Sequence, residues 1–153
     1  MNISSQQSIQ IREMLPSDLS RIILIEREIF LFPWSPGNFA DSIQTGYLCQ
    51  VLEQADTLFG YGVMMMAPDE AHILTIGIAA KWQNKGWGKK LLQHFIQQAH
   101  VGKVKSVLLD VRESNHGAAQ LYRQMGFQQI AIRKGYYPAM CGREDALVMQ
   151  LIL

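Results

Sequence analysis

The sequence has little of what marks a secreted or membrane protein. Only 2 of its 153 residues are cysteines, Cys49 and Cys141, and their spacing fits neither a disulfide framework nor a zinc or redox motif. The N-terminal segment lacks the basic-then-apolar layout of a secretion signal. No apolar run reaches the roughly 18 residues that a membrane-spanning helix needs. We therefore expect a cytoplasmic protein that makes no direct contact with a membrane.

The chain also lacks an excess of charge of either sign. Its 14 Lys and Arg against 13 Asp and Glu give a formal net charge of +1, which provides no global attraction for nucleic acid. The 4 histidines have no metal-ligand arrangement, so we expect no bound metal. The length fits one compact domain, residues 1–153, and an apolar fraction of 48% is typical of globular proteins.

Hydrophobic periodicity predicts an α/β (α+β) fold, a mixed and mostly antiparallel sheet of about six to seven strands flanked by about four helices. Strands are expected over 9–14, 47–53, 57–68, 72–80, 105–111, 128–137 and 145–153, and helices over 18–30, 38–44, 89–101 and 114–125. Ser17 is the predicted N-cap of the first helix, and Ser114 or Asn115 that of the last, which Gly126 ends.

One segment, "KWQNKGWGKKLL" at 81–92, carries the clearest chemical signal. Two familiar phosphate motifs fail here, because Gln83 stands where the Walker pattern needs glycine and Leu91 where the dinucleotide pattern needs it. What remains is Q-x-x-G-x-G between a strand and a helix. Gly86 and Gly88 allow a close backbone approach, and the start of a helix binds anions. A plain strand-to-helix turn with solvated lysines is the alternative.

This loop, together with "TIGI" (75–78) and "SNHGAAQLYRQMGF" (114–127), resembles the GCN5-related N-acetyltransferase (GNAT) superfamily. The resemblance implies a GNAT fold and acetyl-CoA as co-substrate, with the pyrophosphate on the loop amides and the pantetheine arm along the strand. The cofactor-binding residues that it implies are Ile76, Gly77, Ile78, Asn84, Lys85, Gly86, Trp87, Gly88, Lys89 and Asn115.

Three shorter motifs, "FPWS", "RKGYYP" and "GREDAL", resemble the bacterial ribosomal-protein-alanine N-acetyltransferases of the RimI type. This narrower resemblance implies acetylation of the N-terminal alanine of small-subunit ribosomal protein eighteen, with Trp34, Tyr136 and Tyr137 as substrate-binding residues. From the residues alone, Trp34 can equally be a lid over the core and the two tyrosines a strand end. The segment 143–145 can equally be a solvated turn.

Acyl transfer to an amine needs an oxyanion donor, a base and an acid. The resemblance assigns the acid to Tyr122, and the Ile78 amide is the candidate oxyanion donor. The resembling enzymes carry a glutamate where this chain has Asp110, which is shorter by about 1.5 Å. A bridging water can span that gap. Tyr122 as a core tyrosine and Asp110 as a structural carboxylate are the alternatives; the fallback bases are Glu70, Glu113 and His116.

Three functions therefore stay open. The first is N-terminal acetylation of a ribosomal protein, the second is acetylation of a lysine or a small amine, and the third is a non-catalytic acyl-CoA-binding module. A basic ribosomal N-terminus would favour an acidic groove, for which the candidates are Asp69, Glu70, Glu144 and Asp145. The sequence leaves the oligomeric state open.

Overall fold

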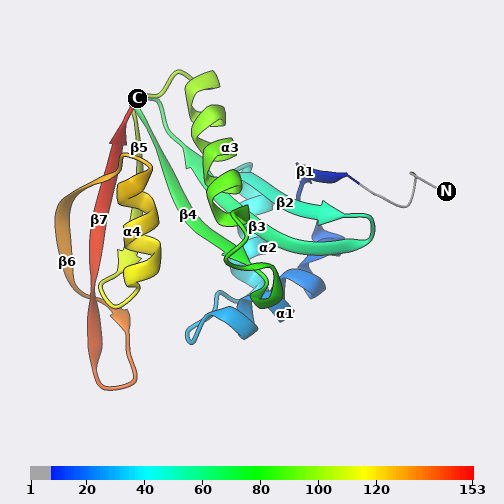
Figure 1. The fold of residues 1–153 in the computed structure, drawn as a ribbon, viewed down its shortest axis with the longest axis horizontal. Coiled ribbons are helices and arrows are strands. Elements are labelled where there is room, and N and C mark those ends of the chain that lie inside the picture. The colour runs from blue at the N-terminus through cyan, green and yellow to red at the C-terminus, as the bar shows by residue number, and fades with distance from the viewer. Residues whose placement is uncertain (1–7) are drawn as a thin grey trace. The chain divides into compact units, whose positions relative to one another are not determined.

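The computed structural model describes residues 8–153, and its elements follow the predicted order (Figure 1). The strands are β1 (Ile9–Glu13), β2 (Leu48–Gln54), β3 (Thr57–Met66), β4 (Glu70–Ile78), β5 (Ser106–Arg112), β6 (Gln128–Pro138) and β7 (Arg143–Ile152). The helices are α1 (Leu19–Ile29), α2 (Pro36–Thr45), α3 (Trp87–Val101) and α4 (His116–Gln124). Within residues 8–153, none of these helices combines the length and hydropathy that a membrane crossing requires.

The strands pair in the order β1-β2-β3-β4-β5-β7-β6. β4 and β5 are parallel, and α3 is the crossover that a parallel pair needs. The pairs β1–β2, β2–β3, β5–β7 and β6–β7 are antiparallel, which confirms the predicted mixed sheet. The chain divides into two compact units, the first running to Met64 and including Thr75–Gln93, the second comprising Met65–Leu74 and His94–Leu153. One domain over 1–153 stays a prediction.

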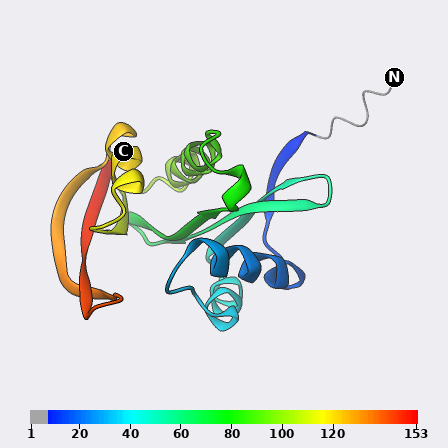
Figure 2. The same cartoon turned by 60° about the horizontal axis from the view of Figure 1, so that its bottom comes forward.

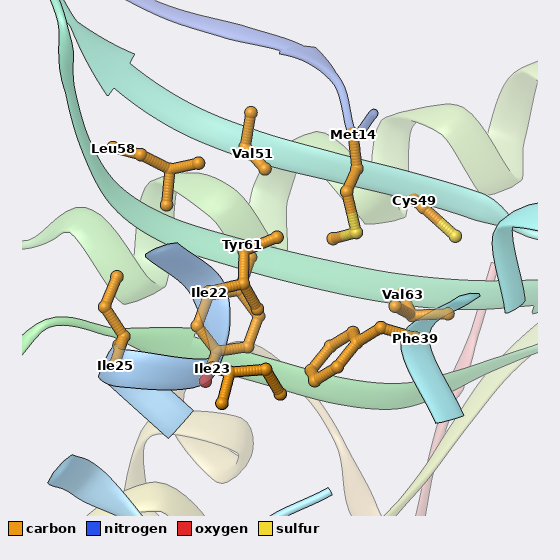
Figure 3. Packing of buried hydrophobic residues seen from close by; sticks show 10 residues of the cluster. All are labelled: Met14, Ile22, Ile23, Ile25, Phe39, Cys49, Val51, Leu58, Tyr61 and Val63. Carbon is orange, nitrogen blue, oxygen red and sulfur yellow. The ribbon is translucent and has the colours of Figure 1, made fainter. Parts of the chain in front are cut away.

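In the first unit, α1 and α2 lie on the same side of β2 and β3 (Figure 2). Apolar residues recur in α1 at the spacing of one helix face, so the helix turns its isoleucines toward the strands. Phe39 of α2 contacts Tyr61 of β3 edge-on, with ring centroids 5.6 Å apart. Figure 3 shows this cluster, which comprises Met14, Ile22, Ile23, Ile25, Phe39, Cys49, Val51, Leu58, Tyr61 and Val63.

A β-bulge in β3 changes the direction of one aromatic side chain. Leu52 pairs with Gly60 and the next residue, Glu53, pairs with Leu58, so Phe59 is the extra residue. Such a bulge turns a side chain away from the regular alternation. Phe59 instead stacks on Trp82, in the short 3₁₀ turn after β4, at 4.0 Å between ring centroids. The hairpin therefore supports the segment that leads into α3.

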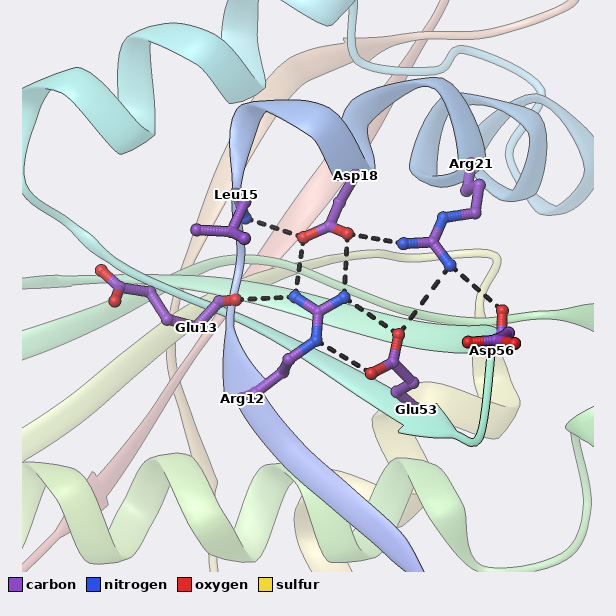
Figure 4. Close-up of polar contacts among 7 residues, drawn as sticks. All are labelled: Arg12, Glu13, Leu15, Asp18, Arg21, Glu53 and Asp56. Carbon is purple, nitrogen blue, oxygen red and sulfur yellow. Dashed lines mark hydrogen bonds and ion pairs between the residues drawn. The ribbon is translucent and has the colours of Figure 1, made fainter. Parts of the chain in front are cut away.

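The start of α1 differs from the prediction. Ser17 is not the N-cap, because Pro16–Asp18 forms a 3₁₀ turn and α1 begins only at Leu19. The Asp18 carboxylate reaches back to accept from the Leu15 amide at 2.8 Å. It also accepts two hydrogen bonds from Arg12, at 2.8 and 2.9 Å, and one from Arg21 at 2.7 Å (Figure 4). Hydrogen bonding to Arg12 lowers the pKa of Asp18 from 3.8 to about 2.

In the second unit, α4 begins and ends with the residues that the sequence indicated. The Asn115 side chain is the N-cap and accepts from the Ala118 amide at 3.2 Å. Gly126 follows the helix at a φ of +101°, which glycine adopts without strain. β5 is largely buried between β4 and β7, whereas β6 is an exposed edge strand.

We expect Asp18→Asn to lower the free energy of unfolding at pH 7 by about 2 kcal/mol, because the folded chain holds the pKa of this buried carboxyl near 2. A depressed carboxyl pKa stabilises the fold fully above about pH 4, and this stabilisation disappears as the pH falls toward 2. Urea unfolding at a series of pH values measures the effect. Asp41→Asn, at an exposed carboxylate of α2, is the control. A deficit that stays constant down to pH 2 would contradict this account.

Candidate active site

The loop before α3 has the backbone geometry of an anion-binding site. Gly86 lies at a φ of +89°, and nothing lies within 4 Å of where its Cβ would be. Asn84 is at +61°, a conformation that asparagine tolerates better than most residues. The first intrahelical bond runs from the Lys90 amide to the Gly86 carbonyl, at 3.1 Å. The amides of the first turn of α3 therefore have no partner within the helix.

The charge at this helix start has the sign that an anion requires. The first turn of α3 contains no acidic residue, although acidic side chains are the usual complement of the positive end of the helix dipole. It carries Lys89 and Lys90 instead, and Lys90 lies over the Trp87 ring at 4.9 Å. Lys85 lies over Trp82 at 5.9 Å. The positive end of the helix dipole and the nearby lysines therefore favour a negatively charged ligand.

The loop is tied to the end of β4. The Gln83 side-chain amide donates to the Ile78 carbonyl at 2.9 Å, and a Cβ on Gly88 would lie 3.9 Å from the Ile78 side chain. Glu28 of α1 accepts from the Ala80 amide at 3.0 Å, just beyond the strand. The predicted loop residues and the predicted strand residues are therefore neighbours in the first unit.

Gly77 in β4 is required by packing. A Cβ at this position would lie 2.5 Å from the Tyr61 hydroxyl and 3.0 Å from the Ile29 side chain. No side chain fits at such distances, since Tyr61 is fully buried and Ile29 packs against the same core. The sequence prediction placed Gly77 among the cofactor-binding residues and did not include this close approach of Tyr61.

The hydroxyl of Tyr61 donates to Glu26 of α1 at 2.6 Å. The other carboxylate oxygen of Glu26 accepts from the backbone amide of Trp34 at 2.8 Å. Burial raises the pKa of Glu26, and burial together with this carboxylate raises the pKa of Tyr61. Trp34 itself is half-buried and packs on Phe39 at 5.0 Å between ring centroids.

In the second unit, Tyr122 of α4 is buried at 9% exposure. Burial raises the pKa of its hydroxyl to about 12, so this group keeps its proton throughout the neutral range. Its ring packs on Phe127 at 5.9 Å. Asn115, three residues after the end of β5, has its side-chain oxygen engaged as the helix cap, which leaves its amide hydrogens as the donors for a ligand.

Asp110 lies near the end of β5, with its side chain 19% exposed. Arg133 of β6 donates to it from Nε at 3.3 Å, and the Arg133 guanidinium also lies 5.6 Å from the centre of the Tyr136 ring. The negative charge of Asp110 contributes to a raised pKa of Tyr137, although burial is the larger cause. The structure therefore brings Asp110 and the two predicted substrate tyrosines to the same part of the second unit.

The segment 143–145 is the beginning of β7 and not a solvated turn. Glu144 pairs with Arg112 at 3.0 Å and accepts from the Ser114 amide at 2.7 Å. Asp145 accepts from the Gly135 amide at 2.8 Å, where Gly135 takes a φ of +58°. Both carboxylates thus hold the β6–β7 hairpin that carries the tyrosines. An acidic groove built from them stays a prediction.

Two arginines, Arg143 of the hairpin and Arg112 of β5, position Tyr136 and Tyr137. Arg143 donates to the Gly135 and Tyr136 carbonyls at 2.6 and 3.0 Å. Arg112 lies over the Tyr137 ring at 4.4 Å and donates to the Pro138 carbonyl at 2.7 Å. The tyrosine rings are 5.0 Å apart and nearly perpendicular.

The fallback bases Glu70, Glu113 and His116 are all exposed. In the described part of the chain, no three His, Cys, Asp or Glu side chains gather closely enough to hold a metal ion. Two contributors were missed by the sequence reasoning, Glu26 and Arg133. Glu26 could have been found, because it occupies the apolar stripe of α1 between Ile22 and Ile29.

Comparison with known proteins shows the family of the chain. The model of the acetyltransferase (GNAT) family matches residues 19–127. The [ribosomal protein bS18]-alanine N-acetyltransferase of Escherichia coli strain K12 is 36% identical over 135 residues, 88% of this chain and 91% of that protein. Its Haemophilus influenzae counterpart is 37% identical over 137 residues, 89% of this chain and 93% of that protein.

A solved structure extends the likeness to three dimensions. The crystal structure of the ribosomal-protein-S18-alanine N-acetyltransferase from Escherichia coli matches with a TM-score of 0.89 at 34% identity, covering 95% of this chain and 94% of that one. The family model spans the interval from α1 to the residue after Gly126, which includes the loop, Asp110 and Tyr122. The chain belongs to the acetyltransferase (GNAT) family.

Proposed function

We propose that this chain transfers an acetyl group from acetyl-CoA to the N-terminal α-amine of a ribosomal protein that begins with alanine, the counterpart of bS18. Acetyltransferases of the GNAT fold use acetyl-CoA. The observation that carries the proposal is the start of α3, where free first-turn amides and lysines meet an open Gly86. The acceptor is inferred from relatives that are 36 and 37% identical over nearly their whole length.

Residues of the first unit bind the pyrophosphate and the thioester of the donor. The pyrophosphate of acetyl-CoA accepts hydrogen bonds from the amides of 84–89, with the positive end of the helix dipole and the nearby lysines supplying charge. The thioester lies along Ile76–Ile78, where the Ile78 amide is the proposed donor to the oxyanion of the tetrahedral intermediate. Gln83 supports this assignment, because it ties the phosphate loop to the same strand end.

Tyr122 is the proposed general acid. Its buried hydroxyl is fully protonated at neutral pH, so a donor is always present when the C–S bond breaks. A hydroxyl with a pKa of about 12 is a weak acid toward an aqueous thiolate. The desolvation that raises the pKa of this phenol also raises that of a thiol leaving beside it, so the two values move together.

Asp110 is the proposed base that takes the proton from the incoming ammonium, directly or through one water. An α-amine has a reference pKa of about 7.7–8.0, against about 10.4 for lysine. A sizeable fraction of the acceptor is therefore neutral near pH 7. Asp110, which is one methylene shorter than the glutamate of the resembling enzymes, then has fewer protons to remove. Arg133, which holds Asp110 at 3.3 Å, keeps the carboxylate oriented.

Replacing Tyr122 by Phe should lower kcat by about a hundredfold or more, because a positioned proton donor contributes about 10²–10⁴ in rate. The KM for acetyl-CoA should change by less than about threefold, since the donor is bound by the loop of the first unit. Steady-state kinetics with an alanine-starting peptide measures both. A kcat equal to that of the wild type would remove Tyr122 from the reaction.

Replacing Asp110 by Asn should steepen the pH profile of kcat/KM. Without the base only the neutral amine reacts, so the rate of the variant should rise about tenfold between pH 6 and pH 7 and level off above pH 8. The wild type should rise less over the same interval. Asp110→Glu, which restores the residue of the resembling enzymes, is the control and should keep the shallow profile. Parallel wild-type and Asn profiles would exclude Asp110 as the base.

The acceptor is tested with two peptides and mass spectrometry. A peptide that starts with alanine should gain one acetyl group at its N-terminus, whereas an N-terminally blocked peptide with a free lysine should remain unchanged. Acetylation of the blocked peptide would instead favour a lysine acetyltransferase. Binding of acetyl-CoA without transfer to either peptide, or to a polyamine, would favour a non-catalytic module.

A further inference from the structure

Glu26 is a buried acidic group that the proposed mechanism does not use. It is 2% exposed and lies on the apolar face of α1. No Lys, Arg or His side chain within residues 8–153 forms a salt bridge with it, and its two oxygens accept instead from a tyrosine hydroxyl and a backbone amide. A carboxylate in such surroundings is a poor choice for stability alone, because an apolar residue of similar volume would avoid its desolvation.

The two donors come from elements with different tasks in the proposed reaction. The Trp34 amide, 2.8 Å from Oε2, belongs to the loop between α1 and α2. The Tyr61 hydroxyl, 2.6 Å from Oε1, stands over Gly77 of β4, where only a hydrogen fits. Glu26 thereby joins the loop that carries the predicted acceptor-binding Trp34 to the strand that carries the predicted thioester contacts. All four residues lie in the first unit.

The loop that Glu26 holds exposes apolar side chains. Leu31 is 68% exposed and Phe32 is 38% exposed, and α1 ends directly before them with Phe30 in an extended conformation. Exposed apolar residues next to a half-buried tryptophan are suited to contact another chain. A loop that already holds one conformation binds the acceptor more tightly, because less conformational entropy is lost on binding.

We propose that Glu26 is a positioning residue for the acceptor, which fixes the Trp34 loop against β4 through its two hydrogen bonds and so presets the place of the substrate N-terminus. The inference rests on the proposed function for the identity of the acceptor. It adds a residue, and a link through Tyr61 to Gly77, that the chemistry of acyl transfer alone does not require.

Two substitutions separate this role from a structural one. Glu26→Met keeps nearly the same volume on the apolar face of α1 but cannot accept either hydrogen bond. Glu26→Gln removes the charge and keeps both links, because its carbonyl oxygen can accept from Trp34 while its amide donates to the Tyr61 oxygen. Asp18→Asn is the matched control, since it removes a buried carboxylate at the other end of the same helix without touching the loop.

The expected result is a split between the two substrates. Glu26→Met should raise the KM for the alanine-starting peptide about tenfold, as expected for losing a hydrogen bond that orders the loop. The KM for acetyl-CoA should change by less than about twofold. Glu26→Gln and Asp18→Asn should keep the wild-type KM for the peptide, whatever their effect on the unfolding midpoint.

Hydrogen exchange at the Trp34 amide gives a second reading that needs no activity. This amide should exchange faster in Glu26→Met than in Glu26→Gln. An unchanged peptide KM in Glu26→Met, or a Gln variant as impaired as the Met variant, would overturn the inference. If the wild-type chain leaves the peptide unmodified, the proposed function is wrong. Equal exchange of the Trp34 amide in the Met and Gln variants would show separately that Glu26 does not hold the loop.

Discussion

A hydroxyl group that is removed completely from water must find an acceptor, and this requirement organises the first unit. Tyr61 is fully buried, and its hydroxyl finds Glu26 at 2.6 Å. An unpaired hydroxyl in the same place would destabilise the fold, because its hydrogen bonds to water would be lost without replacement. The acceptor comes from α1, and the Tyr61 hydroxyl leaves no room for a side chain at Gly77. The second carboxylate oxygen of Glu26 accepts from the Trp34 amide.

In the second unit, an ion pair, a cation–ring contact and hydrogen bonds to the backbone shape the β6–β7 hairpin. Arg112 pairs with Glu144 and lies over the Tyr137 ring, while Arg143 and Asp145 form hydrogen bonds with the backbone of Gly135 in β6. These contacts are partly solvated, where single ion pairs contribute little to stability. Their value lies in geometry, since they position the two tyrosines, while Arg133 of β6 holds the Asp110 carboxylate on the same part of the unit. Tyr122 contrasts with them, as a buried hydroxyl whose raised pKa keeps its proton in place.

Much of this arrangement could be predicted from the sequence. The strand and helix order, the Asn115 cap and the Gly126 stop all follow from local patterns, because caps and periodicity depend on neighbours in the chain. The glycine loop could also be recognised, and its position between a strand and a helix was right. The Ser17 cap was wrong because Asp18, three residues past Leu15, competes for the backbone and forms a 3₁₀ turn instead.

What could not be predicted depends on partners far along the chain. Arg133 meets Asp110 across 23 positions, and Tyr61 meets Glu26 across 35. No local pattern pairs such residues, because the pairing arises only when strands take their register. Glu26 is the exception, because its position on the apolar stripe of α1 indicates from the sequence that it needs a buried partner.

The bulge at Phe59 has a consequence for how such chains are recognised. The glycine loop rests on an aromatic surface, and that surface exists because one extra residue in the β2–β3 hairpin turns Phe59 toward Trp82. The side-chain period of a strand is two, so a hairpin that gained or lost one residue would turn Phe59 to the other face. A relative could then retain every letter of the loop and still lack its support. The letters of the loop can be recognised within residues 81–92, but the support beneath them depends on a hairpin more than twenty residues upstream.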